Sequence, residues 1–212
     1  MKPSICPAIL ASDADDFRAQ IERVTPAAVR LHIDLSDGEF ASSKTVRIDE
    51  VWWPGGMQAD LHVMYKKPFD HATMLLDLRP QLIIVHAEAE GDFIAFADRA
   101  HKQGVRVGVA LQPQTMPDVI RPALKHIDHV LIFSGHLGSF GGKANLSLLD
   151  KVKVLRALKP QLEIGWDGGV SDGNARQLAQ NGIDVLNSGG FIQKADDPFE
   201  AFQILVRSAK AQ

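Results

Sequence analysis

The sequence predicts an α/β protein that folds as one (β/α)8 TIM barrel over residues 1–212. Short apolar runs alternate with longer amphipathic stretches along the chain, and eight such runs can be counted. A length of 212 residues is at the small end of the range for this fold. A doubly wound open sheet also alternates strands with helices, but eight units favour the closed barrel over the open sheet.

The eight apolar runs are the predicted strands. Several of them are rich in Val, Ile and Leu, as is typical of parallel strands that are covered on both faces. In chain order they are Ile5–Leu10, Val29–Asp34, Gln58–Met64, Leu82–His86, Arg106–Leu111, His129–Phe133, Glu163–Asp167 and Asp184–Ser188. Each run is short enough to be a single strand of a barrel wall.

Amphipathic stretches between the runs predict helices, because their apolar residues recur three or four positions apart. The predicted helices are Asp15–Val24, Phe93–Gln103, Ser147–Leu158, Gly173–Gln180 and Phe199–Ala209. Gly104 and the Asn181-Gly182 pair follow two of them and predict their ends. The segment from Glu50 to Gly56 leaves room for a short helix at best.

Composition excludes several classes of function. The chain has 23 basic and 26 acidic residues, a net charge of −3, which argues against a nucleic-acid-binding surface. No apolar run reaches the roughly 18 residues that cross a membrane, and the N-terminus lacks the apolar core of a secretory signal. Cys6 is the single cysteine, so an internal disulfide and a Cys-rich zinc site are both excluded. We expect a cytoplasmic protein without nucleic-acid or membrane partners.

Histidine and aspartate residues lie at the ends of three predicted strands. His32 and Asp34 share one face of the second strand, because side chains alternate along a strand. His62 on the third strand and Asp167 on the seventh would enter the same end of a barrel, where active sites of this fold lie. Two imidazoles and two carboxylates suit Zn, Mn, Fe or Co. The alternative is a set of polar groups that bond only to one another in the barrel mouth.

Paired glycines follow the last three predicted strands. They are Gly141 and Gly142, Gly168 and Gly169, and Gly189 and Gly190. Glycine lets backbone N–H groups approach an anion closely, and barrels often bind phosphate in this region. Ordinary turn formation is the alternative for any one pair. Together with the predicted metal site, the three pairs indicate a small phosphorylated substrate.

Five segments carry a resemblance to the ribulose-phosphate 3-epimerases. Leu31–Phe40 resembles that family's His-x-Asp-x-Met-Asp-Gly-x-Phe stretch, and Asp60–Met64 is similar to its Asp-Val-His-Leu-Met. Val109–Pro117 resembles Val-x-Leu-Asn-Pro-x-Thr-Pro, Phe140–Gly142 part of Gly-Phe-Gly-Gly, and Glu163–Val170 the Glu-Val-Asp-Gly-Gly segment. The matches follow the family's order over nearly the whole chain.

The resemblance implies a barrel of the ribulose-phosphate-binding type with a divalent metal held by His32, Asp34, His62 and Asp167. It implies that Asp34 and Asp167 act as the acid/base pair that inverts C3 of a pentulose phosphate through an enediolate, and that Met64 and the glycine pairs contact the substrate. It also implies a homo-oligomer, a dimer or larger. The reaction would interconvert ribulose 5-phosphate and xylulose 5-phosphate.

Departures from the family pattern concern substrate contacts. Ala8 stands where the family has a serine that contacts substrate, and Ser36 and Phe133 replace methionines. The alternatives are therefore an allulose-6-phosphate 3-epimerase and a non-catalytic descendant that binds a phosphorylated ligand. A decarboxylase with an Asp-x-Lys-x-x-Asp pattern is disfavoured, because the stretch from Asp34 to Asp37 has no lysine.

The remaining histidines and tryptophans have simpler expected places. His86, at the end of the fourth strand, is expected to be structural or to support the site from behind. Trp166 is expected to point outward from the barrel into the layer beneath the helices. Four histidines are expected at the surface: His71, His101, His126 and His129.

Overall fold

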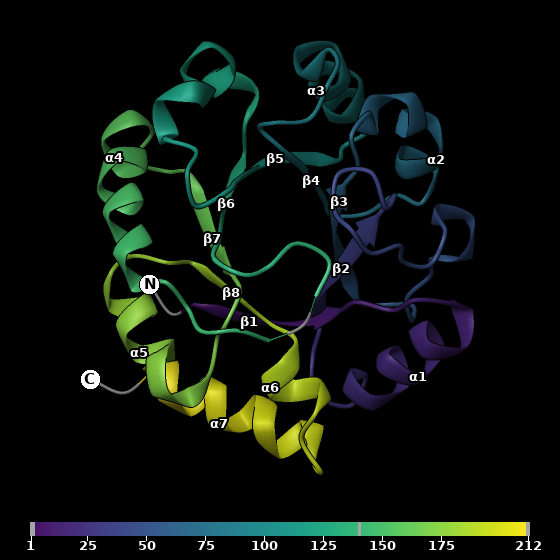
Figure 1. The fold of residues 1–212 in the computed structure, drawn as a ribbon, viewed down its shortest axis with the longest axis vertical. Helices are drawn as coiled ribbons and strands as arrows, with labels where there is room; N and C mark the ends of the chain where they lie inside the picture. Colours follow the sequence, from purple (N-terminus) through teal and green to yellow (C-terminus); the bar gives the residue numbers. More distant parts are fainter. Residues whose placement is uncertain (1–2, 140, 211–212) are drawn as a thin grey trace.

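Eight parallel strands close into a barrel, in which β8 pairs with β1 and every other strand pairs with its successor (Figure 1). The computed structural model describes residues 3–139 and 141–210, so Phe140 of the sixth-loop motif lies outside the described residues. The strands are β1 (Ser4–Ile9), β2 (Arg30–Ser36), β3 (Gln58–Met64), β4 (Leu82–His86), β5 (Arg106–Leu111), β6 (His129–Phe133), β7 (Glu163–Asp167) and β8 (Val185–Ser188). The prediction of a (β/α)8 barrel is confirmed.

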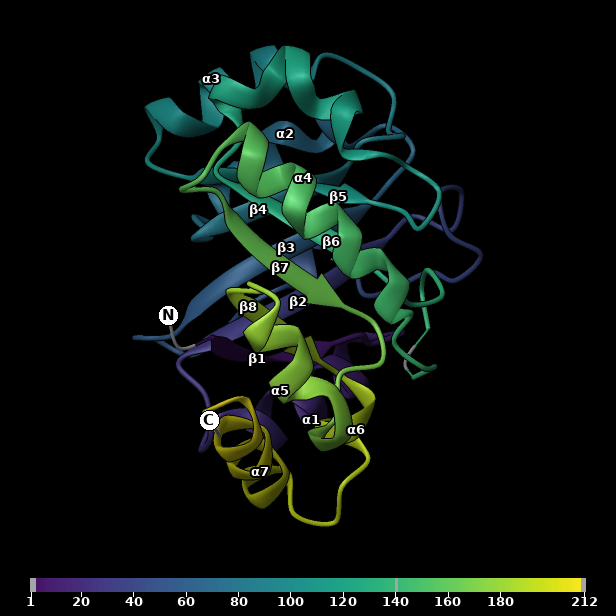
Figure 2. The same ribbon diagram turned by 90° about the vertical axis from the view of Figure 1, so that its left-hand side faces the viewer.

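Helices and 3-10 segments surround the barrel and connect its strands (Figure 2). The α-helices are α1 (Ala14–Val24), α2 (Ala72–Asp77), α3 (Phe93–Lys102), α4 (Asp150–Leu158), α5 (Asp172–Gln180), α6 (Gly190–Gln193) and α7 (Pro198–Lys210). The 3-10 segments are η1 (Ile48–Glu50), η2 (Pro68–His71), η3 (Pro117–His126) and η4 (Leu146–Leu149). Among the described residues, no helix has the length and apolar character needed to cross a membrane.

Aspartate side chains begin two of the helices. Asp13 caps α1 and Asp92 caps α3, each accepting a hydrogen bond from a backbone N–H three residues later, at 2.9 and 3.0 Å. Each cap satisfies a donor that has no partner within its helix. The apolar face of α1, with Phe17 and Ile21, is buried, as its spacing predicts.

Two predicted elements differ from the observed ones by more than one residue at an end. The apolar run predicts the second strand over Val29–Asp34, but β2 runs from Arg30 to Ser36, because Ser36 still pairs with Met64 of β3. Val29 precedes the strand and is 76% exposed. The helix predicted over Ser147–Leu158 begins within the 3-10 segment η4 and becomes α-helical at Asp150.

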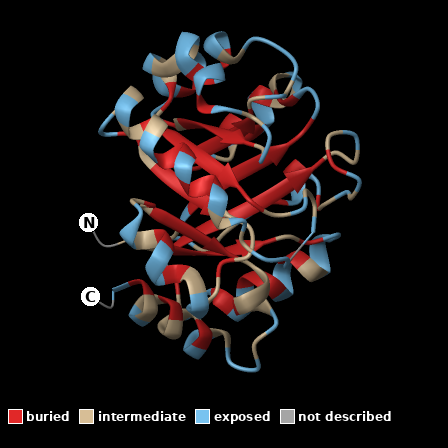
Figure 3. Cartoon of the chain, turned by 60° about the vertical axis from the view of Figure 1, so that its left-hand side comes forward, coloured by how far each residue is buried: buried red, intermediate tan, exposed pale blue. Residues whose placement is uncertain are grey.

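The main hydrophobic core lies between the outer faces of the strands and the helices, and Figure 3 shows the strands buried almost throughout. Trp166 of β7 belongs to this outer layer and is fully buried, as predicted. A smaller apolar cluster lies inside the barrel, formed by Leu82, Ile84, Ala110 and Leu131. These apolar side chains separate the polar groups at the two ends of the barrel.

A network of charged side chains closes the N-terminal end of the barrel. Arg30 donates to Asp60 at 2.9 Å and to Glu163 at 3.2 Å, and Arg106 donates to Glu163 at 3.1 Å. His129 Nδ1 lies 2.8 Å from Glu163 Oε2. The expectation that His129 lies at the surface is wrong: it begins β6, points into the barrel and is fully buried.

Candidate active site

Four of the predicted site residues meet at the C-terminal mouth of the barrel. Asp34 Oδ1 lies 3.1 Å from His32 Nε2 and 2.7 Å from His62 Nδ1. Asp167 Oδ2 lies 3.9 Å from each of the same two ring nitrogens. Both imidazoles are fully buried, while the two carboxylates keep a small exposed fraction toward the mouth.

Strand geometry brings these residues together. His32 and Asp34 are two positions apart on β2, so both side chains point into the barrel. Asp34 lies directly beside His62 in the register of β2 and β3. Asp167 is the last residue of β7 and therefore reaches the same end of the barrel. The alternation of side chains on three short strands thus builds the cluster.

The electrostatic environments of the charged groups differ. Burial alone would raise the pKa of Asp34, but the charges and hydrogen bonds of His32 and His62 hold that pKa well below its usual range. Burial raises the pKa of Asp167, and the negative charge of Asp34 contributes to bringing it to about 6. Burial disfavours the charged form of His32, but Asp34 outweighs burial and raises the pKa of His32 to about 9.

The donor atoms of the cluster fit a divalent cation. One ligand atom from each of the four residues lies within 4.8 Å of the others. Tetrahedral coordination with metal–ligand distances of about 2.0–2.1 Å places neighbouring ligand atoms about 3.3 Å apart. The distances between the carboxylate oxygens and the ring nitrogens, from 2.7 to 3.9 Å, lie on both sides of that value. Buried carboxylates need a positive partner. Two imidazoles and two carboxylates are donors that suit first-row divalent metals.

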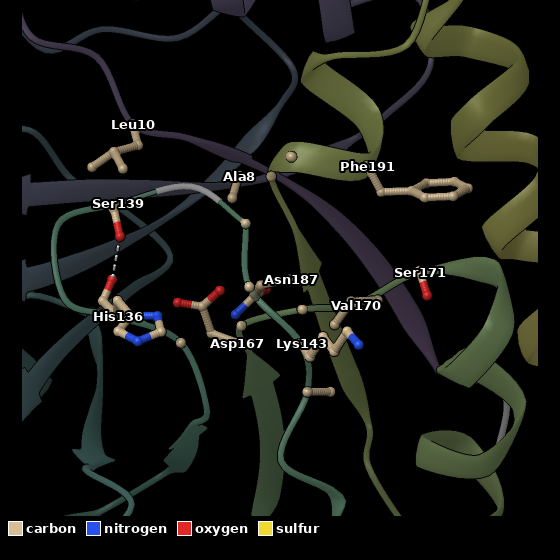
Figure 4. Close-up of a pocket in the computed structure, with 18 of the residues that line it drawn as sticks. Ala8, Leu10, His136, Ser139, Lys143, Asp167, Val170, Ser171, Asn187 and Phe191 are labelled. Carbon is tan, nitrogen blue, oxygen red and sulfur yellow. Dashed lines mark hydrogen bonds between the residues drawn. The ribbon is translucent and has the colours of Figure 1, made fainter.

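A cavity of about 500 Å³ lies above the cluster, and Figure 4 shows the side chains on its walls. Asp34 and Asp167 both line it, and so does Met64. Its other predicted lining residues are the six glycines Gly141, Gly142, Gly168, Gly169, Gly189 and Gly190. The structure therefore brings every predicted substrate-contacting residue to one cavity, whose volume suits a small organic ligand.

Glycine is required where the loops after β6 and β7 touch. Gly168 and Gly169 have φ values of +107° and +72°, which L side chains rarely adopt. A Cβ atom on Gly169 would lie 2.2 Å from the backbone nitrogen of Ala144, and one on Gly168 would lie 2.2 Å from that of Gly135. The two loops therefore pack backbone against backbone beside the cavity.

The connection after β6 crosses the mouth of the barrel toward β2 (Figure 1). Ser43, in the loop after β2, donates a hydrogen bond to the carbonyl oxygen of Gly138 at 2.7 Å. This crossing places His136 and Ser139 on the cavity wall, where the Ser139 hydroxyl donates to the carbonyl oxygen of His136 (Figure 4). The segment after β6 therefore lines the cavity and contacts the loop after β2.

The substituted family positions have different surroundings. Ala8 and Phe133 both line the cavity. Ser36 instead donates its hydroxyl to the carbonyl oxygen of Ser43 at 2.7 Å and so holds the loop after β2. Two of the three departures therefore change the cavity wall itself.

Sequence reasoning missed two residues near the cluster, Asn187 and Glu88. Asn187 lines the cavity beside Asp167 in the register of β7 and β8, and its position one residue before the end of β8 could have identified it. His86 lies behind the cluster, as expected, with its Nε2 2.9 Å from His62 Nε2, and Glu88 lies on the other side of His86. Burial lowers the pKa of His86 to about 4. For Glu88, burial opposes ionisation, but hydrogen bonds from His86 and Thr115 lower the pKa to about 2.

Comparison with known proteins agrees with this geometry. The profile of the ribulose-phosphate 3 epimerase family matches residues 4–192. The ribulose-phosphate 3-epimerase of Helicobacter pylori is 32% identical over 201 residues, covering 91% of this chain and 92% of its own. That of Schizosaccharomyces pombe is 29% identical over 220 residues, covering 100% of this chain and 96% of its own.

A solved structure shares the fold at lower sequence identity. A crystal structure of KGPDC from Streptococcus mutans superposes with a TM-score of 0.75 at 15% identity, covering 99% of this chain and 98% of that one. At this identity the likeness concerns the fold alone, whereas the family profile covers most of the sequence. The chain belongs to the ribulose-phosphate 3-epimerase family, a family of isomerases.

Proposed function

We propose that the protein is a metal-dependent epimerase that inverts C3 of a ketose phosphate and interconverts ribulose 5-phosphate and xylulose 5-phosphate. The observation that carries this proposal is the placement of Asp34 and Asp167 on one cavity beside two buried imidazoles. Family membership supports the same reaction. The four clustered side chains provide the carboxyl groups and the metal ligands that this reaction needs.

Inversion at C3 requires a proton acceptor on one face of the carbon and a proton donor on the other. Asp34 extends from β2 and Asp167 from β7, so the two carboxyl groups approach the cavity from different walls. One carboxylate accepts the C3 proton, and the electron pair of the C–H bond moves into an enediolate. The other carboxyl group then donates a proton to the opposite face, which gives the inverted product.

His32, Asp34, His62 and Asp167 would hold the metal ion. A divalent cation at this place supplies Lewis-acid stabilisation of the negative charge that develops on the substrate oxygens. Met64 and Phe133 add apolar surface to the cavity wall. Such surface excludes water from the reacting carbon.

The glycine-lined wall of the cavity suits the phosphate group. The backbones of the three glycine pairs allow a close approach to phosphate oxygens. Lys143, Lys194 and His136 also line this cavity, and the two lysines add positive charge there. A phosphate bound at this side would leave the sugar carbons extending toward Asp34 and Asp167.

The test follows exchange of the C3 proton. In deuterated water with ribulose 5-phosphate, the purified protein is expected to place deuterium on C3 and to form xylulose 5-phosphate. Asp34→Asn and Asp167→Asn are each expected to lower the exchange rate about 10²- to 10⁴-fold. Asp118→Asn, a change of an exposed aspartate away from the cavity, is the matched control.

Metal content is measured on the same samples by elemental analysis. The wild-type protein is expected to contain a stoichiometric divalent metal and to lose exchange activity when a chelator removes it. Near-normal exchange in Asp167→Asn would contradict the two-carboxylate mechanism. Full activity of the metal-free protein would contradict the metal requirement.

A second candidate is the same reaction on a hexulose phosphate such as allulose 6-phosphate. Ala8 favours it, because this cavity-lining methyl group is small and cannot hydrogen-bond the substrate. The ratio of kcat/KM values for the two ketose phosphates decides between them. A non-catalytic descendant would bind the ligand without any exchange at C3.

A further inference from the structure

Asn187 is a polar residue of the cavity wall that the proposed chemistry does not use. It lies on β8, lines the cavity and is 2% exposed. Its side-chain oxygen is buried and accepts no hydrogen bond, and its amide makes no other bond among the described residues. A buried carboxamide with both ends unpaired lowers the stability of a folded protein. Its place on a cavity wall therefore indicates a partner that binds with the ligand.

The neighbouring strands leave the amide of Asn187 unpaired. On one side, Cys6 of β1 lies beside it in the register, and a thiol is a weak hydrogen-bonding group. Ala8, two residues further along the same face of β1, has a methyl group that cannot hydrogen-bond. On the other side lies Asp167 of β7, and in Figure 4 the amide nitrogen of Asn187 is turned toward its carboxylate. Both side chains line the cavity, so a ligand atom beside that carboxylate also lies next to the amide.

The chemistry of the amide selects its partner. A carboxamide donates hydrogen bonds through its nitrogen and accepts them through its oxygen. Because the described residues hold neither end, the Asn187 side chain can turn either end to a ligand without breaking a hydrogen bond. A hydroxyl group both donates and accepts, so it matches either end of the amide. An apolar ligand surface would leave the amide unpaired at a cost in affinity.

The order of residues along the cavity wall places Asn187 between the reacting carbon and the phosphate. Asp167, its neighbour on β7, is the carboxyl group proposed to act at C3. Gly189 and Gly190 follow Asn187 in the chain and belong to the glycine-lined wall proposed for the phosphate. In a pentulose 5-phosphate, C4 lies between C3 and the carbon that carries the phosphate, and it bears a single hydroxyl group. That hydroxyl group is the part of the substrate nearest to Asn187.

We propose that Asn187 is a specificity-determining residue that hydrogen-bonds the C4 hydroxyl group of a pentulose 5-phosphate while Asp167 faces C3. The inference rests on the proposed function, because that function places C3 at Asp167 and the phosphate at the glycines. It identifies the preferred ligands as ketose phosphates with a hydroxyl group on the carbon after C3. A ligand without this group leaves the amide unpaired in a cavity that the ligand has closed to water, so it binds more weakly.

The test compares ribulose 5-phosphate with its 4-deoxy analogue by isothermal titration calorimetry. For the wild-type protein, the Kd of the analogue is expected to be about 10- to 100-fold higher. For Asn187→Val, the analogue is expected to bind no more than about threefold more weakly than ribulose 5-phosphate, because valine has no polar atom. Ribulose 5-phosphate and xylulose 5-phosphate share the C4 hydroxyl group, so turnover during the measurement leaves the comparison intact.

Two further variants control for shape and for position in the strand. Asn187→Ala opens space where Asn187→Val fills it, so the same loss of discrimination in both variants excludes a purely steric effect. Ser188→Ala is the matched control, because Ser188 is the next residue of β8, donates to the carbonyl oxygen of Val170 at 3.3 Å and is absent from the described lining of the cavity. It is expected to keep the wild-type ratio of Kd values. Circular dichroism checks that each variant is folded.

The outcomes separate this inference from the proposed function. Equal Kd values for the two ligands in the wild type would overturn the inference, and so would a ratio that Asn187→Val leaves unchanged. If the C3 proton exchanges in either case, the proposed function stands alone. If discrimination at C4 depends on Asn187 but no C3 proton exchanges, the proposed function fails and the inference stands. A wild-type protein that does not bind ribulose 5-phosphate would overturn both.

Discussion

Asn187 is a buried polar residue that the described structure leaves without a partner for its side-chain oxygen. It is 2% exposed, it lines the cavity, and its Oδ1 accepts no hydrogen bond from the described residues. Such an atom costs about 1–3 kcal/mol of stability in the folded protein. A residue kept at this cost on a cavity wall is typical of a ligand contact.

Asn187→Val is therefore expected to raise the free energy of unfolding by about 1 kcal/mol. Valine has a similar volume and no polar atom, so it fills the same space without an unsatisfied group. Urea denaturation of the unliganded protein measures the change. Asn174→Val is the control and is expected to lower the free energy of unfolding, because the Asn174 side chain bonds to the backbone of Ser171 and Gly169. A less stable Asn187→Val would contradict the assignment of an unsatisfied oxygen.

Element boundaries could be predicted where an apolar run is followed directly by a turn residue or a polar loop. The ranges of β3, β4, β5, β6 and β7 coincide with the predicted ones. The end of β2 could not be predicted in this way, because Ser36 is polar and remains in the strand only through its pairing with Met64. Local sequence carries no information about such a partner.

The same contrast between local pattern and distant partners explains which site residues could be predicted. His32, Asp34, His62 and Asp167 follow from alternation on strands and from the shared end of a barrel, and the structure places them together. The burial of His129 could not be predicted, because Glu163, the partner that accounts for it, comes 34 residues later. Glu88 likewise lies near the site only through its contact with His86 on β4.

The loop after β7 permits a test at the level of one element. Gly169→Ala would put a methyl group 2.2 Å from the backbone of the β6 loop and would strain a backbone with φ of +72°. The expected result is displacement of the two loops and a rise of at least about tenfold in KM for the sugar phosphate, with the barrel still folded by circular dichroism. Gly104→Ala, also at positive φ but with open space around it, is the control. If Gly169→Ala and the wild type had equal KM values, the contact between the loops would not shape the site.

The whole molecule separates its charged groups into two ends. The N-terminal end holds the network of Arg30, Asp60, Arg106, His129 and Glu163, and the C-terminal end holds the candidate active site. Burial alone would raise the pKa of Glu163, but hydrogen bonds from His129 and Arg30 hold that pKa well below its usual range. The network therefore contributes stability that depends on pH.

The sign of this dependence follows from the lowered pKa. The contribution of ionised Glu163 is complete above the pKa of about 4.3 that glutamate has in the unfolded chain, and it is lost as the pH falls toward the folded-state value. Glu163→Gln is expected to lower the free energy of unfolding by about 2 kcal/mol at pH 7. The difference in the free energy of unfolding between the variant and the wild type should stay constant above about pH 5 and narrow as the pH falls below about 4. Glu22→Gln, a change of an exposed glutamate outside the network, is the control. A difference for Glu163→Gln that stays constant over this pH range would contradict this role.

Pairing between the first and last strands has a consequence for synthesis of the chain. Ser4 of β1 lies beside Val185 of β8, so the hydrogen bonds on one side of β1 must wait until β8 has left the ribosome. Until then the growing sheet has two open edges that can recruit other nascent chains. Because contacts between such distant segments form slowly, we expect truncation before β8 to yield aggregates rather than a smaller folded product.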